Sequence, residues 1–165
     1  MRHACRSRAQ STVEPGPGRV RIAIIAVGKI KQAGLRAPLD DYLGRLRRYG
    51  GCDEIELKDG SDAEVEARFR KAIPERSRVI ALEVTGKTVS SQGLADRVAR
   101  AERDAVGSLV FLIGGAYGLP KSVSASASVQ LSLSALTLPH QLARLVLAEQ
   151  VYRAFTILRG EPYSH

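Results

Sequence analysis

The run L-V-F-L-I at residues 109–113, closed by a glycine pair, constrains the fold more than any other part of the chain. An uninterrupted apolar run that ends at glycines is typical of a strand buried on both faces, as in a parallel sheet. Gly114, Gly115 and Gly118 then remove side chains where another group must approach the backbone closely. A simple tight turn would use the same glycines, so this loop does not define a site by itself.

A second apolar segment, residues 131–138, ends at Pro139, a residue well suited to the first turn of a helix. Two strand ends that each deliver a loop predict a ligand pocket at the carboxyl edge of a parallel sheet. Ser132, Ser134 and Thr137 alternate with leucines here. They fit either a solvated strand edge or a loop whose main-chain groups bind an adenine or a methionine moiety.

The rest of the chain alternates strand-like and helix-like patterns. β-branched or alternating runs predict strands, and apolar stripes at helical spacing predict helices. The alternation predicts one α/β domain over residues 20–165, with a mainly parallel sheet covered by helices on both faces. The expected strands are 20–27, 54–58, 79–84 and 109–113, with a turn at 86–88; the expected helices are 39–49, 63–73, one capped by Ser90 or Ser91 that runs through Ala101, and one from Pro139 to Gly160.

The chain is basic, with a net charge of +8, of which residues 1–19 carry +3. A basic protein favours polyanionic partners, nucleic acid before membrane, although a basic surface kept for solubility is the alternative. Residues 1–19 lack apolar periodicity, and we expect a disordered extension. Its arginines and serines fit a transit peptide, a cloning remnant or an over-extended start site equally well.

Several protein classes are excluded. Cys5 and Cys52 have no metal-ligand spacing, so neither a disulfide framework nor a zinc site is expected, and no metal. No apolar run is long enough to cross a membrane, and no secretory segment is recognisable, which predicts a cytosolic protein. Gly-Lys-Thr at 86–88 lacks the earlier glycine of a phosphate loop, because Ala81 stands there. Residues 114–118 do not match the dinucleotide-binding glycine pattern either.

The last helix and the tail hold the candidate polar groups. Glu149 and Arg153 lie four residues apart and are neighbours on one helix face. His140 at the helix start fits a capping role better than a catalytic one, since nothing nearby completes a triad. Tyr163 and His165 belong either to a frayed tail or to a surface that stacks on an unpaired base.

Together, these segments closely resemble the ribosomal RNA large subunit methyltransferase H family, which belongs to the SPOUT class. The matching stretches are I-A-I-I-A-V-G-K-I-K at 22–31, L-I-G-G-A-Y-G-L at 112–119, L-S-A-L-T-L-P-H-Q at 133–141, E-Q-V-Y-R-A at 149–154 and G-E-P-Y at 160–163. The resemblance runs from Val20, where the family's initiator methionine would stand, to the end. It implies a cytoplasmic homodimer with a C-terminal trefoil knot, a topology that pattern reasoning alone argues against.

The resemblance also implies the activity: S-adenosylmethionine-dependent methylation of N3 of a pseudouridine in the helix 69 loop of 23S rRNA, on assembled ribosomes. The matching catalytic positions are Arg153, Glu149 and Tyr163. The family often ends in Pro-Tyr-His, whereas this chain has Ser164 before His165, which leaves His165 without an assigned role. The matching cofactor positions are Leu82, Gly114, Leu133, Ser134, Ala135, Leu136, Thr137 and Leu138.

Two other functions remain open from the residues alone. A non-enzymatic RNA-binding or ribosome-associated α/β module would have the same basic charge and need no cofactor pocket. A protein that binds a small nucleotide would have a pocket but no salt-dependent affinity for RNA.

Overall fold

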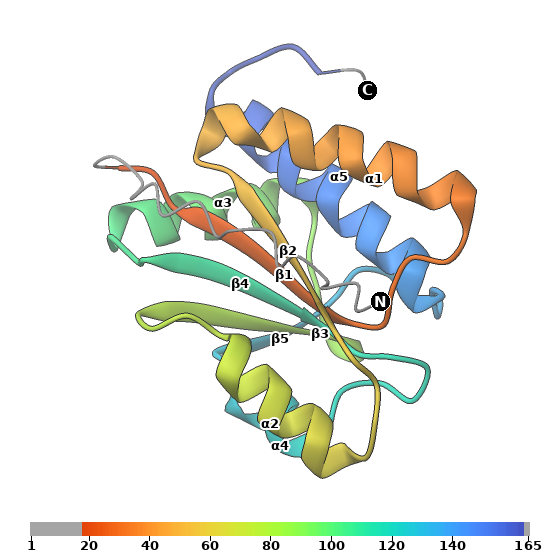
Figure 1. Ribbon diagram of the computed structural model, residues 1–165. Coiled ribbons are helices and arrows are strands. Elements are labelled where there is room, and N and C mark those ends of the chain that lie inside the picture. Colours follow the sequence, from red (N-terminus) through yellow and green to blue (C-terminus); the bar gives the residue numbers. More distant parts are fainter. Residues whose placement is uncertain (1–17, 164–165) are drawn as a thin grey trace, which may run out of the picture.

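The computed structural model describes residues 18–163, which form a five-stranded parallel sheet between two layers of helices (Figure 1). Most of the expected N-terminal extension, together with Cys5 and His165, lies outside the described residues. The strands follow the order β2-β1-β4-β3-β5, and every neighbouring pair is parallel. The predicted α/β class with a mainly parallel sheet is therefore confirmed.

The elements alternate along the chain as expected for a sheet whose strands are joined by helical crossovers. A single-turn 3-10 helix at Arg47–Tyr49 follows the first helix. The elements are β1 (Arg21–Val27), α1 (Ala33–Leu46), β2 (Cys52–Leu57), α2 (Asp62–Ala72), β3 (Ser77–Thr88), α3 (Ser91–Arg103), β4 (Ser108–Ile113), α4 (Lys121–Ser126), β5 (Val129–Ser132) and α5 (His140–Leu158).

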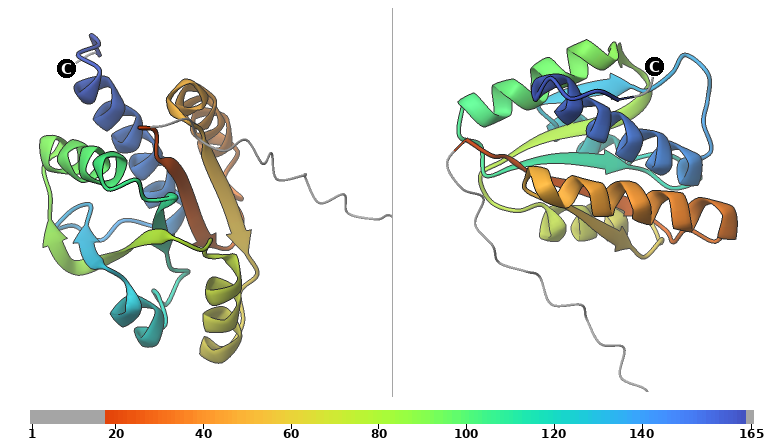
Figure 2. Two further views of the ribbon diagram at one scale, coloured as in Figure 1. Left: turned by 90° about the vertical axis from the view of Figure 1, so that its left-hand side faces the viewer. Right: turned by 90° about the horizontal axis from the view of Figure 1, so that it is seen from above.

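The sheet has a hydrophobic core on each face. Helices α1, α3 and α5 pack on one face, and α2 and α4 cover the other, as Figure 2 shows from two further directions. All residues of β4 are buried, which confirms the prediction of a strand covered on both sides. Because all strands are parallel, the loops that follow them emerge at one edge, the carboxyl edge.

The first helix begins earlier than predicted. Pro38 was expected to precede it, but α1 starts at Ala33 and contains Pro38. Proline removes one backbone donor, which leaves the carbonyl of Gly34 four residues earlier without its helical partner. Gly34 is exposed and has no side chain, so water can reach that carbonyl, and the helix tolerates the proline.

The sheet edge at β3 and β5 also differs from the prediction. Strand β3 does not turn at residues 86–88 but continues through them, with a register shift against β5 between Leu82 and Lys87. Strand β5 ends at Ser132, so residues 133–139 form a loop, one of the two interpretations left open above. The short helix α4 was not predicted, because its serines and alanines carry little apolar periodicity.

Candidate active site

A pocket of about 490 Å³ opens at the carboxyl edge of the sheet. Its walls come from three places: the irregular part of β3, the glycine turn after β4, and the loop after β5 with the start of α5. As predicted, the glycine turn at 114–118 and the loop at 133–138 line a single cleft. The lining residues include Leu82, Glu83, Val84, Gly114, Gly115, Ala116, Leu133, Ser134, Leu136, Thr137, Leu138, Pro139, His140 and Ala143.

The turn after β4 is built so closely that only glycine fits at its base. A Cβ atom on Gly114 would lie 2.2 Å from the carbonyl carbon of Gly118 and 2.5 Å from the nitrogen of Leu119. Gly118 has a positive φ of 81°, and its amide donates to the carbonyl of Gly115 at 3.0 Å. The backbone itself is therefore the pocket wall at this point.

The irregular part of β3 supplies lining residues that sequence reasoning missed. Residues 83–86 bulge away between two pairings of Leu131, which faces Leu82 before the bulge and Lys87 after it. A Cβ on Gly86 would lie 2.6 Å from the carbonyl carbon of Leu131, so the two backbones almost touch. A glycine inside a strand pattern is the signal for such a bulge. Glu83 and Val84 reach the pocket in this way.

The loop after β5 is held by its own serines. The Ser132 hydroxyl donates to the carbonyl of Ser134 at 2.7 Å, and the Ser134 hydroxyl accepts from the amide of Leu136 at 2.9 Å. Most residues predicted for the cofactor line the pocket, and Ala135 is the exception. His140 is the first residue of α5, after an N-cap at Pro139, and also lines the pocket.

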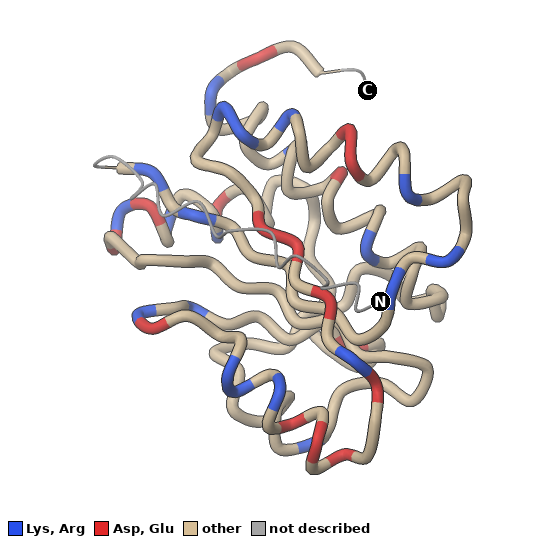
Figure 3. The backbone as a smooth tube through the Cα atoms, in the orientation of Figure 1, with Lys and Arg blue, Asp and Glu red and all other residues tan. Residues whose placement is uncertain are grey.

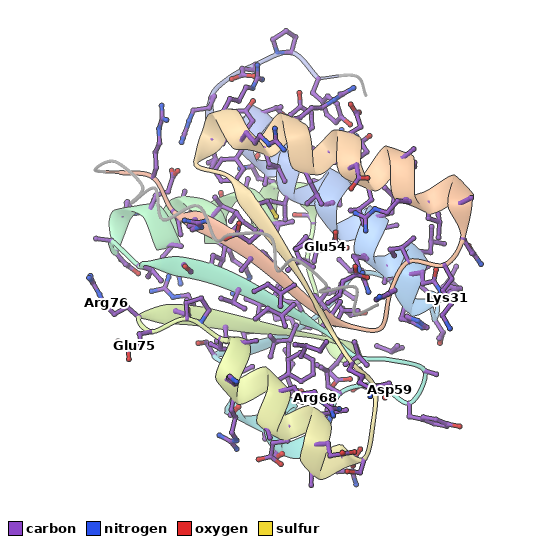
Figure 4. All side chains as sticks on the ribbon, in the orientation of Figure 1. Lys31, Glu54, Asp59, Arg68, Glu75 and Arg76 are labelled. Carbon is purple, nitrogen blue, oxygen red and sulfur yellow. The ribbon has the colours of Figure 1, made fainter. Side chains whose placement is uncertain are left out.

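A buried arginine fixes α5 against the sheet just beyond the pocket wall. The Arg144 side chain is 0% exposed and donates to Glu54 and Glu56 on β2, both at 2.9 Å, and to the carbonyl of Gly28 at 3.0 Å. Arg36 of α1 donates a hydrogen bond to the same Glu54, and this bond is the main cause of the raised pKa of Arg36. Figure 4 shows Glu54 between β2 and the helices above it.

The predicted catalytic side chains form one group near the other end of α5. Arg153 donates from Nη2 to Oε1 of Glu149 at 2.8 Å, which confirms the expected pair. The second oxygen of Glu149 accepts from Gln150 at 2.6 Å. The Arg153 guanidinium lies over the ring of Tyr163, 4.6 Å from its centroid. The tail residue is therefore seated on the helix rather than frayed.

Tyr163 is held by an aromatic cluster. Its hydroxyl lies 3.1 Å from that of Tyr42 on α1, and its ring meets that of Tyr152 edge-on at 5.0 Å. Burial, followed by the hydrogen bond with Tyr42 and the charge of Glu149, raises the pKa of Tyr163. The phenol is therefore neutral at physiological pH and can donate a hydrogen bond. The tail is anchored further by Glu161, which accepts from Tyr49 at 2.7 Å.

The group of Glu149, Arg153 and Tyr163 is separate from the pocket within one chain. Ala143 lines the pocket, and Arg153 lies ten residues further along the same helix. At 1.5 Å per residue this is about 15 Å along the axis. None of Glu149, Arg153 and Tyr163 is among the pocket residues.

Three further features bear on the class of protein. Within residues 18–163, no group of three or more histidine, cysteine, aspartate or glutamate side chains could hold a metal ion. Burial raises the pKa of the free Cys52 thiol, so it is not a ready nucleophile. No helix in this part of the chain is both long and apolar enough to span a bilayer.

Comparison with known proteins agrees with this architecture. A family model described as "Predicted SPOUT methyltransferase" matches residues 20–165. A crystal structure of a probable methyltransferase from Bordetella pertussis Tohama I superposes with a TM-score of 0.56 at 12% identity, covering 84% of this chain and 95% of that one. This likeness concerns the fold. The class defined by fold and family model is thus the SPOUT methyltransferases.

The sequence relatives narrow the class. Ribosomal RNA large subunit methyltransferase H of Sorangium cellulosum (strain So ce56) is 53% identical over 146 residues, which cover 88% of this chain and all of that protein. The protein of the same name from Streptococcus equi subsp. zooepidemicus is 41% identical over 157 residues, covering 87% and 99%. The chain belongs to the SPOUT methyltransferases, and within them to the ribosomal RNA large subunit methyltransferase H family.

Proposed function

We propose that this protein transfers a methyl group from S-adenosylmethionine to N3 of a pseudouridine in the helix 69 loop of 23S rRNA, acting on assembled ribosomes in the cytoplasm. The observation that carries the proposal is the pocket at the carboxyl edge, walled by main chain of the glycine turn and of the loop after β5. Family membership and the names of the relatives support the substrate.

The residues present fit this cofactor. The volume of about 490 Å³ lies in the range of small-molecule sites. Gly114 leaves space for a close approach to the backbone, and the loop at 133–138 offers main-chain groups between apolar side chains. Glu83 adds an acidic group suited to hydroxyls or an ammonium. Leu82, Gly114 and residues 133–138 would hold the cofactor, which supplies an already activated methyl group.

The chemistry left to the protein is alignment and charge stabilisation. The imide N3–H of a pseudouridine is a weak acid, and Arg153 would stabilise the negative charge that develops on the flanking carbonyl. Glu149 would orient Arg153, since both of its oxygens already accept hydrogen bonds, which makes it a poor base. Tyr163, neutral and held by Tyr42, would stack on the base or donate to it.

We infer a homodimer from the separation between the pocket and the group of Glu149, Arg153 and Tyr163. A pocket without a charge-stabilising group, and an arginine about 15 Å away along one helix, cannot act on the same base within one chain. A second copy that brings its Arg153 to the first copy's pocket would complete the site. The expected trefoil knot would enclose this pocket, with the loop after β5 and α5 as its threaded parts.

The deciding experiment is transfer of tritiated methyl from S-adenosylmethionine to ribosomes that lack the modification. We expect incorporation into 23S rRNA and a reverse-transcription stop in the helix 69 loop, because an N3-methyl group blocks base pairing. Free 23S rRNA serves as the comparison substrate. Salt-dependent binding to ribosomes with no label transferred would instead support a non-enzymatic ribosome-associated module.

Gly114→Ala tests the backbone-walled pocket. The new methyl group would collide with backbone atoms of Gly118 and Leu119, which cannot rotate away. We expect destabilisation of about 1–3 kcal/mol and at least about a tenfold loss of S-adenosylmethionine affinity, measured by urea unfolding and calorimetry.

Gly44→Ala is the matched control for that substitution. Gly44 lies in α1, where an added Cβ meets no atom within 4 Å. Replacing a glycine inside a helix should stabilise the protein by about 1 kcal/mol and leave cofactor affinity unchanged. Equal cofactor affinity in both variants would contradict the assigned pocket.

A further inference from the structure

The turn after β4 carries a tyrosine that the fold does not use. The side chain of Tyr117 is 100% exposed, and Val84 and Leu136 on the pocket rim are 52% and 75% exposed. These are three of the four large apolar side chains exposed within residues 18–163, and the fourth, Ile157, lies on α5. A single exposed apolar side chain needs no explanation, but three at one pocket mouth form a patch.

The turn presents Tyr117 outward from a fixed base. Gly115 and Gly118 form an isolated antiparallel bridge, and a Cβ on Gly115 would lie 3.2 Å from Cγ1 of Val27 at the end of β1. Ala116 and Gly118 line the pocket on either side of Tyr117, whereas Tyr117 itself does not. The ring therefore lies outside the cavity, beside its opening, where it contributes nothing to the core.

Three lysines follow the neighbouring strands at the same edge of the sheet as this turn. Lys29 and Lys31 follow β1, and Lys58 follows β2, the two strands next to β4 on that side of the sheet. All three are exposed, and none forms an ion pair with a described residue. Figure 4 shows Lys31 at this end of the molecule, and Figure 3 shows the blue segments after both strands. Asp59 is the acidic neighbour, close to Gly115.

We propose that Tyr117 stacks on an unpaired base of the RNA beside the nucleotide that enters the pocket, while the lysines contact its phosphates. The inference rests on the proposed function and adds a substrate-contacting residue to it. An aromatic ring flanked by free basic groups is the arrangement that binds single-stranded nucleic acid. The three exposed ammonium groups, none of them in an ion pair within residues 18–163, favour a polyanion over an apolar protein surface as the occupant.

The test compares Tyr117→Ala and Tyr117→Phe with the unmodified protein. Loss of one stacking contact should weaken ribosome binding and raise the KM for ribosomes by about 5- to 150-fold in Tyr117→Ala. Tyr117→Phe keeps the ring face and should stay close to the original. S-adenosylmethionine affinity should change by less than about twofold in both variants, because the ring lies outside the cavity. Irradiation with a uridine-rich oligonucleotide containing 5-iodouridine should label position 117 by mass spectrometry.

A charge variant tests the lysines. Lys31→Gln should lower the slope of log affinity against log salt by about 1. Lys71→Gln, at the C-terminal end of α2 and so at the opposite edge of the sheet, should leave that slope unchanged.

Three outcomes overturn the inference: ribosome binding by Tyr117→Ala within about twofold of the original, an equal loss of cofactor affinity, or a shift from dimer to monomer by light scattering. The last would make the patch a subunit interface. If the unmodified protein transfers no methyl group but still binds and cross-links RNA through Tyr117, the proposed function fails and this inference stands.

Discussion

Arg153→Ala is expected to lower single-turnover methyl transfer to ribosomes by at least about 10²–10³-fold, the cost of removing one charge-stabilising donor from a reaction centre. Arg153 forms one group with Glu149 and Tyr163, and in the proposed function it stabilises the negative charge that develops on the base. Because Arg153 does not line the pocket, S-adenosylmethionine affinity should be nearly unchanged by calorimetry. A large loss of cofactor binding would count against the assignment.

Two variants sharpen that experiment. Arg153→Lys keeps the positive charge but cannot reproduce the paired donation from Nε and Nη2 to Glu149, so most of the loss should remain. Arg100→Ala removes an exposed arginine from the last turn of α3 and serves as the control for net charge. If Arg100→Ala lost as much transfer as Arg153→Ala, the effect would reflect the overall basic charge instead of a catalytic position.

Arg144→Met should have the largest effect on stability. The substitution keeps apolar bulk but removes the ion-pair partner of Glu56 and leaves Glu54 with Arg36 alone. Because Glu54 keeps Arg36 and Glu56 is partly exposed, we expect a loss of about 3 kcal/mol in the free energy of unfolding in urea, the lower end of the cost of breaking a buried pair. Arg100→Met, at an exposed position, should stay within about 0.5 kcal/mol of the original.

A double-mutant cycle separates the charge from the shape of Arg144. In a Glu56→Gln background the loss caused by Arg144→Met should shrink, because the carboxylate that loses its ion-pair partner has been replaced by a neutral amide. The same loss in both backgrounds would mean that packing of the long side chain, and not its ion pairs, holds α5 in place.

The sheet and both pocket bends were predictable because their signals are local. The apolar run of β4, the glycines after it and the serines among leucines each restrict the backbone without help from distant residues. The combination of five short stretches then makes the family recognisable. The pairing of Glu149 with Arg153 follows from helical spacing alone.

The features that were missed depend on contacts between distant segments. Nothing near Arg144 in the sequence reveals that its partners are Glu54 and Glu56, about ninety positions earlier. The bulge that brings Glu83 into the pocket exists because β3 pairs with β5, which the chain reaches only after two more helices. Helix α1 can start before Pro38 because water reaches the Gly34 carbonyl that the proline leaves without its helical partner. The spacing of apolar residues does not reveal this exposure.

One helix carries both a wall of the pocket and the proposed catalytic arginine. α5 is nineteen residues long, about 28 Å from end to end. Inserting or deleting one residue between these two points would turn one end against the other by about 100°. The number of residues between these two points therefore sets both the distance and the relative orientation of the pocket wall and Arg153.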